Sequence, residues 1–168
     1  MAGVLKHVLI TPARFKEAAA FVRWLMAYGN MADVDPAFPS DRQAALVFRN
    51  SVIVLSLDGT KPVAVTWGIP GERMTDKGPE PFIRIIVHLG RPDEGDVNRD
   101  RYIDANTLAY IAEMEKRGID TMYAEVPTEH WAHVRDYIGL NLQPSKIEGK
   151  MEAWTTFSDI KARVLARG

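Results

Sequence analysis

Apolar side chains along this chain follow two spacings, and the spacing distinguishes helix from strand. From Phe15 to Met26 they recur at every third or fourth position, which is the period of an amphipathic helix. Thr11-Pro12 precedes this segment and is typical of a helix start, while Gly29 follows it and is typical of a helix end. The pattern therefore predicts a first helix that packs one face on a core.

The same period returns in the second half of the chain. It predicts a helix over 102–117, where Lys116-Arg117-Gly118 places cations and a glycine at the C-terminus. A further helix is predicted to start at Pro127-Thr128 and to end before Gly139. A short last helix is expected after Ser158, whose side chain is predicted to cap it.

Short apolar runs bounded by turn residues predict the strands. They lie at 4–10, 51–57, 62–68, 82–89, 119–126, 140–143 and 150–157. Asp58-Gly59-Thr60-Lys61 joins the second and third runs and predicts an antiparallel hairpin, because Asp-Gly tolerates the positive φ angles of a tight turn. The segment 69–81 contains several prolines and glycines and is predicted to be a mobile connection.

The predicted order is strand, helix, three strands, helix, strand, helix and two strands (β-α-β-β-β-α-β-α-β-β). The chain has 168 residues, 46% of them hydrophobic, and it shows no internal repeat. This length suits one core of ordinary size. We therefore expect a single α+β (α/β) domain that spans residues 1–168.

Composition narrows the functional classes. The formal net charge is −1, which gives no electrostatic footprint for nucleic acid or for an anionic membrane. No apolar stretch approaches the length of a membrane span. Cysteine is absent, so disulfides, thiolate metal sites and a cysteine nucleophile are excluded. The expectation is a cytoplasmic protein that contacts neither nucleic acid nor membrane.

The loop over 90–101 joins a predicted buried strand to a predicted helix. Such a junction can hold phosphate on its backbone N–H groups. This loop also carries four acidic side chains, Asp93, Glu94, Asp96 and Asp100, which repel an anion. Arg91, Arg99 and Arg101 offset that repulsion if they point toward the ligand.

Two segments resemble those of the GNAT (GCN5-related N-acetyltransferase) superfamily. In the segment 130–140, Ile138, Gly139 and Leu140 match the close of the late GNAT helix. Arg91 and Gly95 resemble the beginning of the family's phosphate arm in a degenerate form, because the spacing is one residue longer and no second small residue follows. With the predicted element order, the resemblance covers the chain from about Val4 to Thr156. It implies a central mixed, mostly antiparallel sheet flanked by helices, in which the fourth and fifth strands diverge.

The resemblance also implies an activity and a set of site residues. The activity is transfer of an acetyl or other acyl group from coenzyme A to an amine on a small molecule or a protein. The implied cofactor contacts are the backbone of Val87 and Leu89 for the pantetheine arm and, for the pyrophosphate, Arg91, Gly95, Arg99 and Arg101. Glu125 or His88 would supply the proton path. Tyr137 is the candidate general acid, two residues beyond the family's tyrosine position, which aligns with Arg135.

Each candidate also has a structural interpretation. Glu125 can be a solvated glutamate at a strand end, and His88, on the same predicted strand face as Phe82, Arg84 and Ile86, can be a satisfied packing residue. His130 and His133 have a spacing able to bind metal, but no third ligand is apparent, so no metal is expected.

Fold resemblance alone does not establish catalysis. The alternative hypothesis is a non-catalytic GNAT-fold protein that binds a protein partner within a larger assembly, for example as a phage virion component. Its location would then be the virion or another assembly instead of the cytoplasm.

Overall fold

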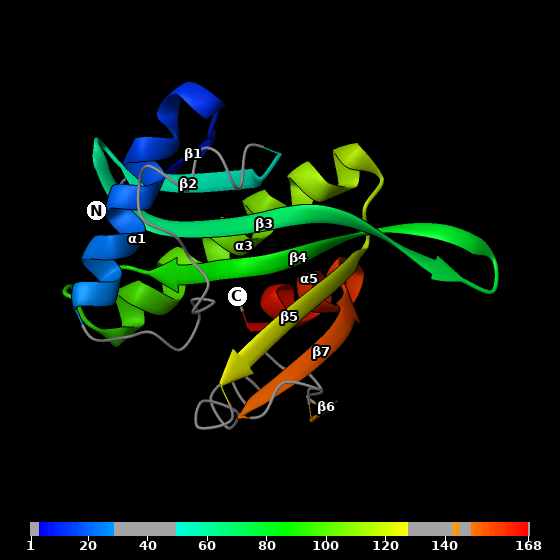
Figure 1. Ribbon diagram of the computed structural model, residues 1–168. Helices are drawn as coiled ribbons and strands as arrows, with labels where there is room; N and C mark the ends of the chain where they lie inside the picture. Colours follow the sequence, from blue (N-terminus) through cyan, green and yellow to red (C-terminus); the bar gives the residue numbers. More distant parts are fainter. Residues whose placement is uncertain (1–3, 29–49, 128–142, 145–148, 168) are drawn as a thin grey trace.

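A computed structural model of the chain describes residues 4–28, 50–127, 143–144 and 149–167 (Figure 1). The predicted helix after Pro127, with Tyr137, His130 and His133, lies outside the described residues. The elements up to residue 90 are β1 (Lys6–Leu9), the 3₁₀ helix η1 (Pro12–Arg14), α1 (Phe15–Ala27), β2 (Val52–Asp58), β3 (Lys61–Thr75) and β4 (Gly78–Gly90). The later elements are α3 (Asp96–Arg117), β5 (Thr121–Pro127), β6 (Gln143–Pro144), β7 (Lys150–Thr156) and α5 (Phe157–Arg167).

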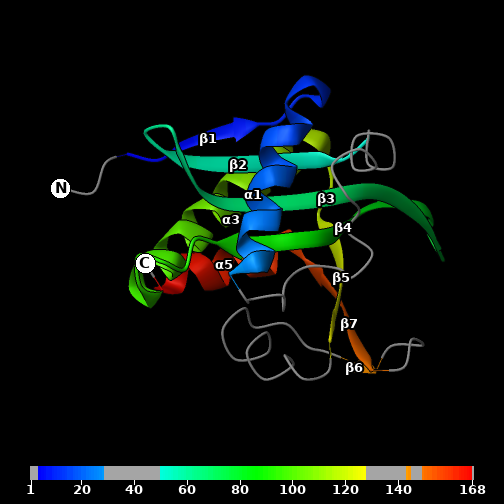
Figure 2. The ribbon, with the colours of Figure 1, turned by 60° about the vertical axis from the view of Figure 1, so that its left-hand side comes forward.

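The described strands form one sheet in the order β1-β2-β3-β4-β5-β7-β6. Among them, β4 and β5 pair in parallel and every other neighbouring pair is antiparallel. Helix α1 crosses one face of the sheet, and α3 and α5 lie on the other (Figures 1 and 2). The mixed, mostly antiparallel sheet flanked by helices is thus confirmed.

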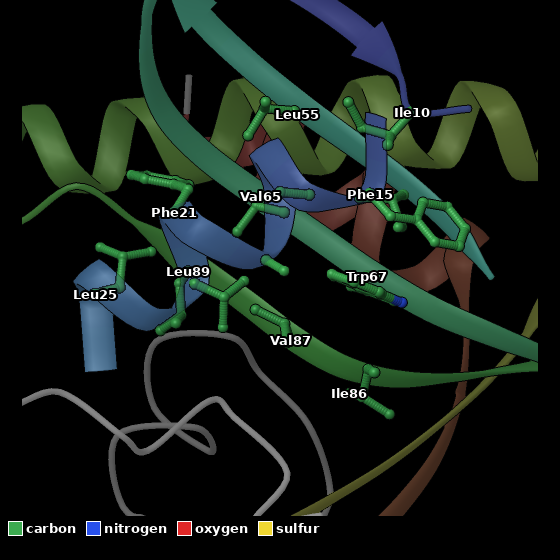
Figure 3. Close-up of a cluster of buried hydrophobic side chains, with 14 residues drawn as sticks. Ile10, Phe15, Phe21, Leu25, Leu55, Val65, Trp67, Ile86, Val87 and Leu89 are labelled. Carbon is green, nitrogen blue, oxygen red and sulfur yellow. The ribbon is translucent and has the colours of Figure 1, made fainter. Parts of the chain in front are cut away.

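Successive side chains of a strand point to opposite faces of the sheet, so the hydrophobic core has one part on each face. Between the sheet and α1, Phe15 packs against the fully buried Trp67 with ring centroids 5.9 Å apart (Figure 3). Between the sheet and α3, Ile83 and Met114 are fully buried, and the Tyr110 hydroxyl donates to the carbonyl of Val52 at 2.9 Å. The sheet is therefore anchored on both sides across β2, β3 and β4.

The prediction of a mobile connection over 69–81 is wrong. Strands β3 and β4 continue through this segment as a paired hairpin with a turn at Thr75–Gly78. Its three prolines fall in alternate pairs, Pro70↔Ile83, Glu72↔Pro81 and Met74↔Pro79. Their nitrogens therefore all point away from the partner strand, where a missing N–H costs no ladder hydrogen bond.

Two helix starts also differ from prediction. Helix α3 begins at Asp96, inside the segment predicted to be loop, because Gly95 turns the chain at φ 92° directly before it. Helix α5 begins at Phe157, with the Asp159 N–H donating to Thr156 Oγ1 at 3.1 Å. Ser158 is thus inside the helix, where its backbone N–H and hydroxyl both donate to Asp120.

Candidate active site

Strands β4 and β5 separate partway along their length. They pair only from Phe82↔Thr121 to Ile85↔Ala124. Beyond these pairs the two strands diverge, as Figure 1 shows. We call the unpaired part, Ile86–Gly90 of β4 and Glu125–Pro127 of β5, the splay. Among the described strands, none pairs with this part of β4 on the side toward β5.

The backbone of β4 presents polar groups to the splay at alternate residues. In an antiparallel ladder, hydrogen-bonded pairs alternate with pairs whose N–H and C=O point outward. The Arg91 N–H donates to the Val63 carbonyl at 2.7 Å, so the bonded pairs that precede it are Leu89↔Val65 and Val87↔Trp67. The outward groups are therefore those of His88 and Gly90, one residue away from the Val87 and Leu89 groups expected from the sequence.

Helix α3 starts where β4 ends, and the two approach closely. A side chain at Gly90 would meet the Arg99 carbonyl at 2.9 Å and Ile103 Cγ1 at 2.6 Å. Gly95 caps α3 without a side-chain hydrogen bond, and the first helical bond is from the Arg99 N–H to the Gly95 carbonyl. The N–H groups of residues 96–98 therefore have no partner within the helix and point out of its N-terminus, which is the geometry of an anion site.

Each acidic side chain of the 90–101 loop has a cationic partner. Asp93 pairs with Arg91 (3.2 Å) and Glu94 with Lys61 (2.9 Å). Asp96 and Asp100 both pair with Arg99, at 3.3 and 3.2 Å. These pairs reduce the repulsion that the sequence predicted for an anion, but they also occupy the arginines.

Arg91 lies on the α1 side of the sheet. Its guanidinium packs over the Trp24 ring of α1, 4.4 Å from the centroid, and its Nε donates to the Pro62 carbonyl at 2.8 Å. To contact a ligand at the start of α3, this side chain would have to leave Trp24 and Asp93. Arg101 lies over the Tyr102 ring and donates to Asn98.

Glu125 is the first residue of β5 beyond the last β4–β5 pair, so it stands where the two strands begin to diverge, which we call the mouth of the splay. Its side chain is only 9% exposed, and Arg84 Nη2 lies 4.0 Å from Glu125 Oε2. The Tyr123 hydroxyl donates to Glu125 Oε1 at 2.5 Å. The carboxylate is thus held in place by neighbours on its own strand and on β4.

Glu152 of β7 joins this cluster. It is the register partner of Glu125, and its Oε2 is 3.0 Å from the Tyr123 hydroxyl oxygen. The Tyr123 ring packs on Trp154, with centroids 4.6 Å apart, which fixes the direction of the hydroxyl. Burial is the largest cause that raises the pKa of Tyr123, and both carboxylates add to it, so the hydroxyl keeps its proton.

His88 is not beside Glu125. A bulge shifts the register between Trp67↔Val87 and Gly68↔Ile85, so Ile86 and Val87 both join the cluster under α1. The bulge turns His88 to the α3 face, whereas Arg84 and Glu125 lie on the opposite face. The predicted common face of His88 with Phe82, Arg84 and Ile86 is therefore wrong.

A buried hydrogen-bond network holds the His88 ring. Thr66 Oγ1 donates to Asn106 Oδ1 at 2.5 Å, so it accepts at 3.1 Å from His88 Nδ1. Asn106 Nδ2 in turn donates to Ser56 Oγ and to the carbonyl of Val54. His88 thus anchors the β4 segment whose backbone faces the splay, and nothing in this network connects the ring to Glu125.

The His88 network predicts a loss of stability in acid. Burial lowers the pKa of His88 from 6.5 to about 4; Asp104 raises this pKa and Arg167 lowers it, both by less than burial does. The unfolded chain binds a proton at this histidine below pH 6.5 and the folded chain does not until about pH 4, so the free energy of unfolding falls across that window. At pH 4.5 the expected loss from this group is about 2 kcal/mol.

The measurement is urea unfolding from pH 7 to 4.5 on the native protein and on His88→Gln, which keeps hydrogen-bonding groups but does not titrate. The variant should show a shallower decline over the window. Equal slopes of unfolding free energy against pH for the two proteins would contradict the prediction, since the carboxyl groups contribute equally to both.

The structure brings together some of the predicted residues and separates others. Glu125, the outward backbone beside Val87 and Leu89, and Gly95 all border the splay or the start of α3, while Arg91 and the His88 ring lie elsewhere. Tyr123 and Glu152 were not identified from the sequence as neighbours of Glu125. The signal for Tyr123 is its period-two spacing from Glu125, but the pairing with Glu152 depends on strand register.

Among the described residues, no group of three His, Asp or Glu side chains could hold a metal ion, and no helix is long and apolar enough to cross a membrane.

Comparisons with known proteins agree with this architecture. No family model matches the sequence, and no curated protein matches it. Among solved structures, aminoglycoside N(6')acetyltransferase from Legionella pneumophila has a TM-score of 0.62 at 10% identity, covering 97% of this chain and 98% of its own. The GNAT domain of S. lividans PAT has a TM-score of 0.55 at 17% identity, covering 92% and 91%.

A third similar structure is the putative acetyltransferase YncA from Salmonella typhimurium with acetyl-CoA, with a TM-score of 0.57 at 9% identity, covering 92% and 93%. Likeness at these identities establishes the fold. The chain has the GNAT fold, with the diverging fourth and fifth strands that the family resemblance implied.

Proposed function

We propose that this protein is an acyltransferase that moves an acetyl or other acyl group from coenzyme A to a primary amine. The observation that carries the proposal is the convergence of three features at one end of β4. These are the outward backbone of His88 and Gly90, the N–H groups of residues 96–98 at the N-terminus of α3, and the buried Glu125 carboxylate at the mouth of the splay. Acyl-CoA would supply an activated thioester.

The backbone and the helix start have the chemistry that a coenzyme A arm needs. The N–H and C=O groups of His88 and Gly90 would pair with the amides of the pantetheine arm as a further strand would. The N–H groups of residues 96–98 and the positive end of the α3 dipole would hold the pyrophosphate. Arg99, in the first turn of α3, would turn from Asp96 toward that phosphate, and Arg101 is exposed nearby.

Glu125 has the chemistry of a general base. A primary amine is an ammonium ion at neutral pH and cannot attack a thioester until it loses a proton. Glu125 would accept this proton, and the splay would orient the amine against the acyl carbon, which lowers the entropic part of the barrier. The neighbouring Tyr123 hydroxyl and Arg84 hold the carboxylate in one position.

The second candidate is the non-catalytic GNAT-fold protein. The observation that favours it is the ion pairing at the start of α3, where Arg91 and Arg99 are both engaged by aspartates. This protein would keep the fold and bind a protein partner without acyl-CoA.

Calorimetric titration with acetyl-CoA separates the two. The acyltransferase predicts saturable binding with a dissociation constant in the micromolar range and release of coenzyme A thiol that depends on an added primary amine. No heat at millimolar acetyl-CoA would contradict the enzyme function and favour the second candidate. The α3 site also predicts that binding weakens as salt is raised, because the phosphates are held by charge.

A further inference from the structure

Building on the acyl-transfer function proposed above, we propose that the Tyr123 hydroxyl and Glu152 form the exit route for the proton that Glu125 takes from the substrate ammonium. The three groups form a continuous line across β5 and β7. Glu125 Oε1 is 2.5 Å and Glu152 Oε2 is 3.0 Å from the same hydroxyl oxygen. Tyr123 and Glu152 would thus have roles distinct from that of the base.

The proton count at this cluster is the first argument. A tyrosine hydroxyl has one proton, so it can donate to only one of two carboxylates at a time. Its oxygen can accept a hydrogen bond from the other carboxyl group only when that group is protonated. The arrangement is therefore satisfied when one proton is shared by the two carboxyl groups, with the hydroxyl between them, and that proton can reside on either side.

Placement of the two carboxyl groups gives the route a direction. Glu125 is at the mouth of the splay with a side chain 9% exposed, so a proton there has little direct contact with water. Glu152 lies one strand further from β4, on β7, and is partly exposed. A proton that reaches Glu152 can therefore leave to solvent.

The proton moves from the substrate to solvent in three steps. The ammonium N–H bond breaks with its electron pair left on nitrogen, and the proton moves to the Glu125 carboxylate. The Glu125 carboxyl group then gives its proton to the Tyr123 oxygen while the original Tyr123 proton moves to the Glu152 carboxylate, and Glu152 releases it to water. The hydroxyl stays neutral before and after, in accord with the upward shift of the Tyr123 pKa.

The stoichiometry of acyl transfer requires that one proton leave through this route in each turnover. The overall reaction of an ammonium ion with a thioester gives an amide, a thiol and one proton. The second N–H proton of the amine balances the thiolate that leaves. Glu125 must therefore lose one proton to solvent before the next ammonium ion can be deprotonated.

Ring contacts hold the Tyr123 hydroxyl in position between the two carboxyl groups. Its ring packs on Trp154, and Trp154 packs on Phe82 of β4 with centroids 5.1 Å apart. The Arg73 guanidinium covers the Trp154 ring at 4.1 Å from the centroid. Removing only the hydroxyl leaves these ring contacts in place, so Tyr123→Phe isolates the proton step from the packing.

The experiment uses Tyr123→Phe and Glu152→Gln in the full chain, with acetyl-CoA and the primary amine that the native protein acetylates fastest in a panel. HEPES is the exogenous buffer, because its tertiary amine nitrogens cannot be acetylated. Both variants are expected to lose about tenfold in kcat at low buffer concentration. Raising the HEPES concentration should restore kcat, with KM for acetyl-CoA within twofold of native.

The matched control is Glu72→Gln, which changes an exposed glutamate of β3 and should leave kcat insensitive to buffer. Thermal unfolding checks that the variants are folded. A native kcat in both variants at every buffer concentration overturns the relay and leaves the acyltransferase intact. A loss of kcat that buffer does not restore also overturns it, because the residues then act through packing. Absence of amine-dependent thiol release by the native protein overturns both proposals.

Discussion

Glu125→Gln is expected to lower kcat for amine acetylation by about 10²–10⁴-fold, the usual contribution of a positioned general base. Glutamine has the size of glutamate and keeps a carbonyl that can accept from Tyr123, so the cluster with Glu152 and Arg84 should remain packed. What it lacks is the ability to take a proton from the ammonium ion. The measurement is the rate of coenzyme A thiol release at saturating acetyl-CoA.

Acetyl-CoA affinity provides the internal control for this variant. Glu125 stands on β5, whereas the groups proposed to hold the coenzyme belong to β4 and the start of α3. The dissociation constant measured by calorimetry should therefore stay within about twofold of native. Raising the pH should partly restore the rate, because a larger share of the amine is then already neutral. A kcat within threefold of native at neutral pH would remove Glu125 from the role of base.

Local signals were enough for most of the fold. Asp58-Gly59 turns at φ 65° for Gly59 between β2 and β3, as the dipeptide predicted, and the 3.6-residue period identified α1 and α3. The prolines over 69–81 misled because proline disfavours a strand only where its nitrogen faces a partner. Which way each nitrogen faces depends on the register of β3 against β4, and the sequence does not reveal it.

The candidate site was harder to predict, for the same reason. Glu125 became a candidate through the family resemblance, which places the acceptor amine at its strand, but Glu152 is 27 residues away in the sequence and meets Glu125 only through the pairing of β5 with β7. The bulge near Ile86 reverses the face of His88, and an added residue in a ladder leaves no periodic signal in an apolar run. Arg91 was expected at the phosphate site, yet the alternation of β4 carries it to Trp24 on the other side.

Charge at the start of α3 can be tested without disturbing the fold. Val97 is 83% exposed in the first turn of α3, among the N–H groups that have no helical partner. Val97→Glu is expected to weaken acetyl-CoA binding about 10–100-fold, because a carboxylate there repels phosphate and competes for the same N–H groups. The helix itself should gain slightly in stability, since an acidic side chain in the first turn favours the helix dipole.

Val97→Gln is the matched control, because it has the shape of the glutamate variant and no charge. Its dissociation constant for acetyl-CoA should stay within about threefold of native, and raising the salt concentration should narrow the gap between the two variants. Thermal unfolding of both should match or exceed the native protein. Equal affinity of Val97→Glu and native protein would place the pyrophosphate away from α3, and with it the coenzyme away from the splay, because Gly90 ties the end of β4 directly to the first turn of that helix.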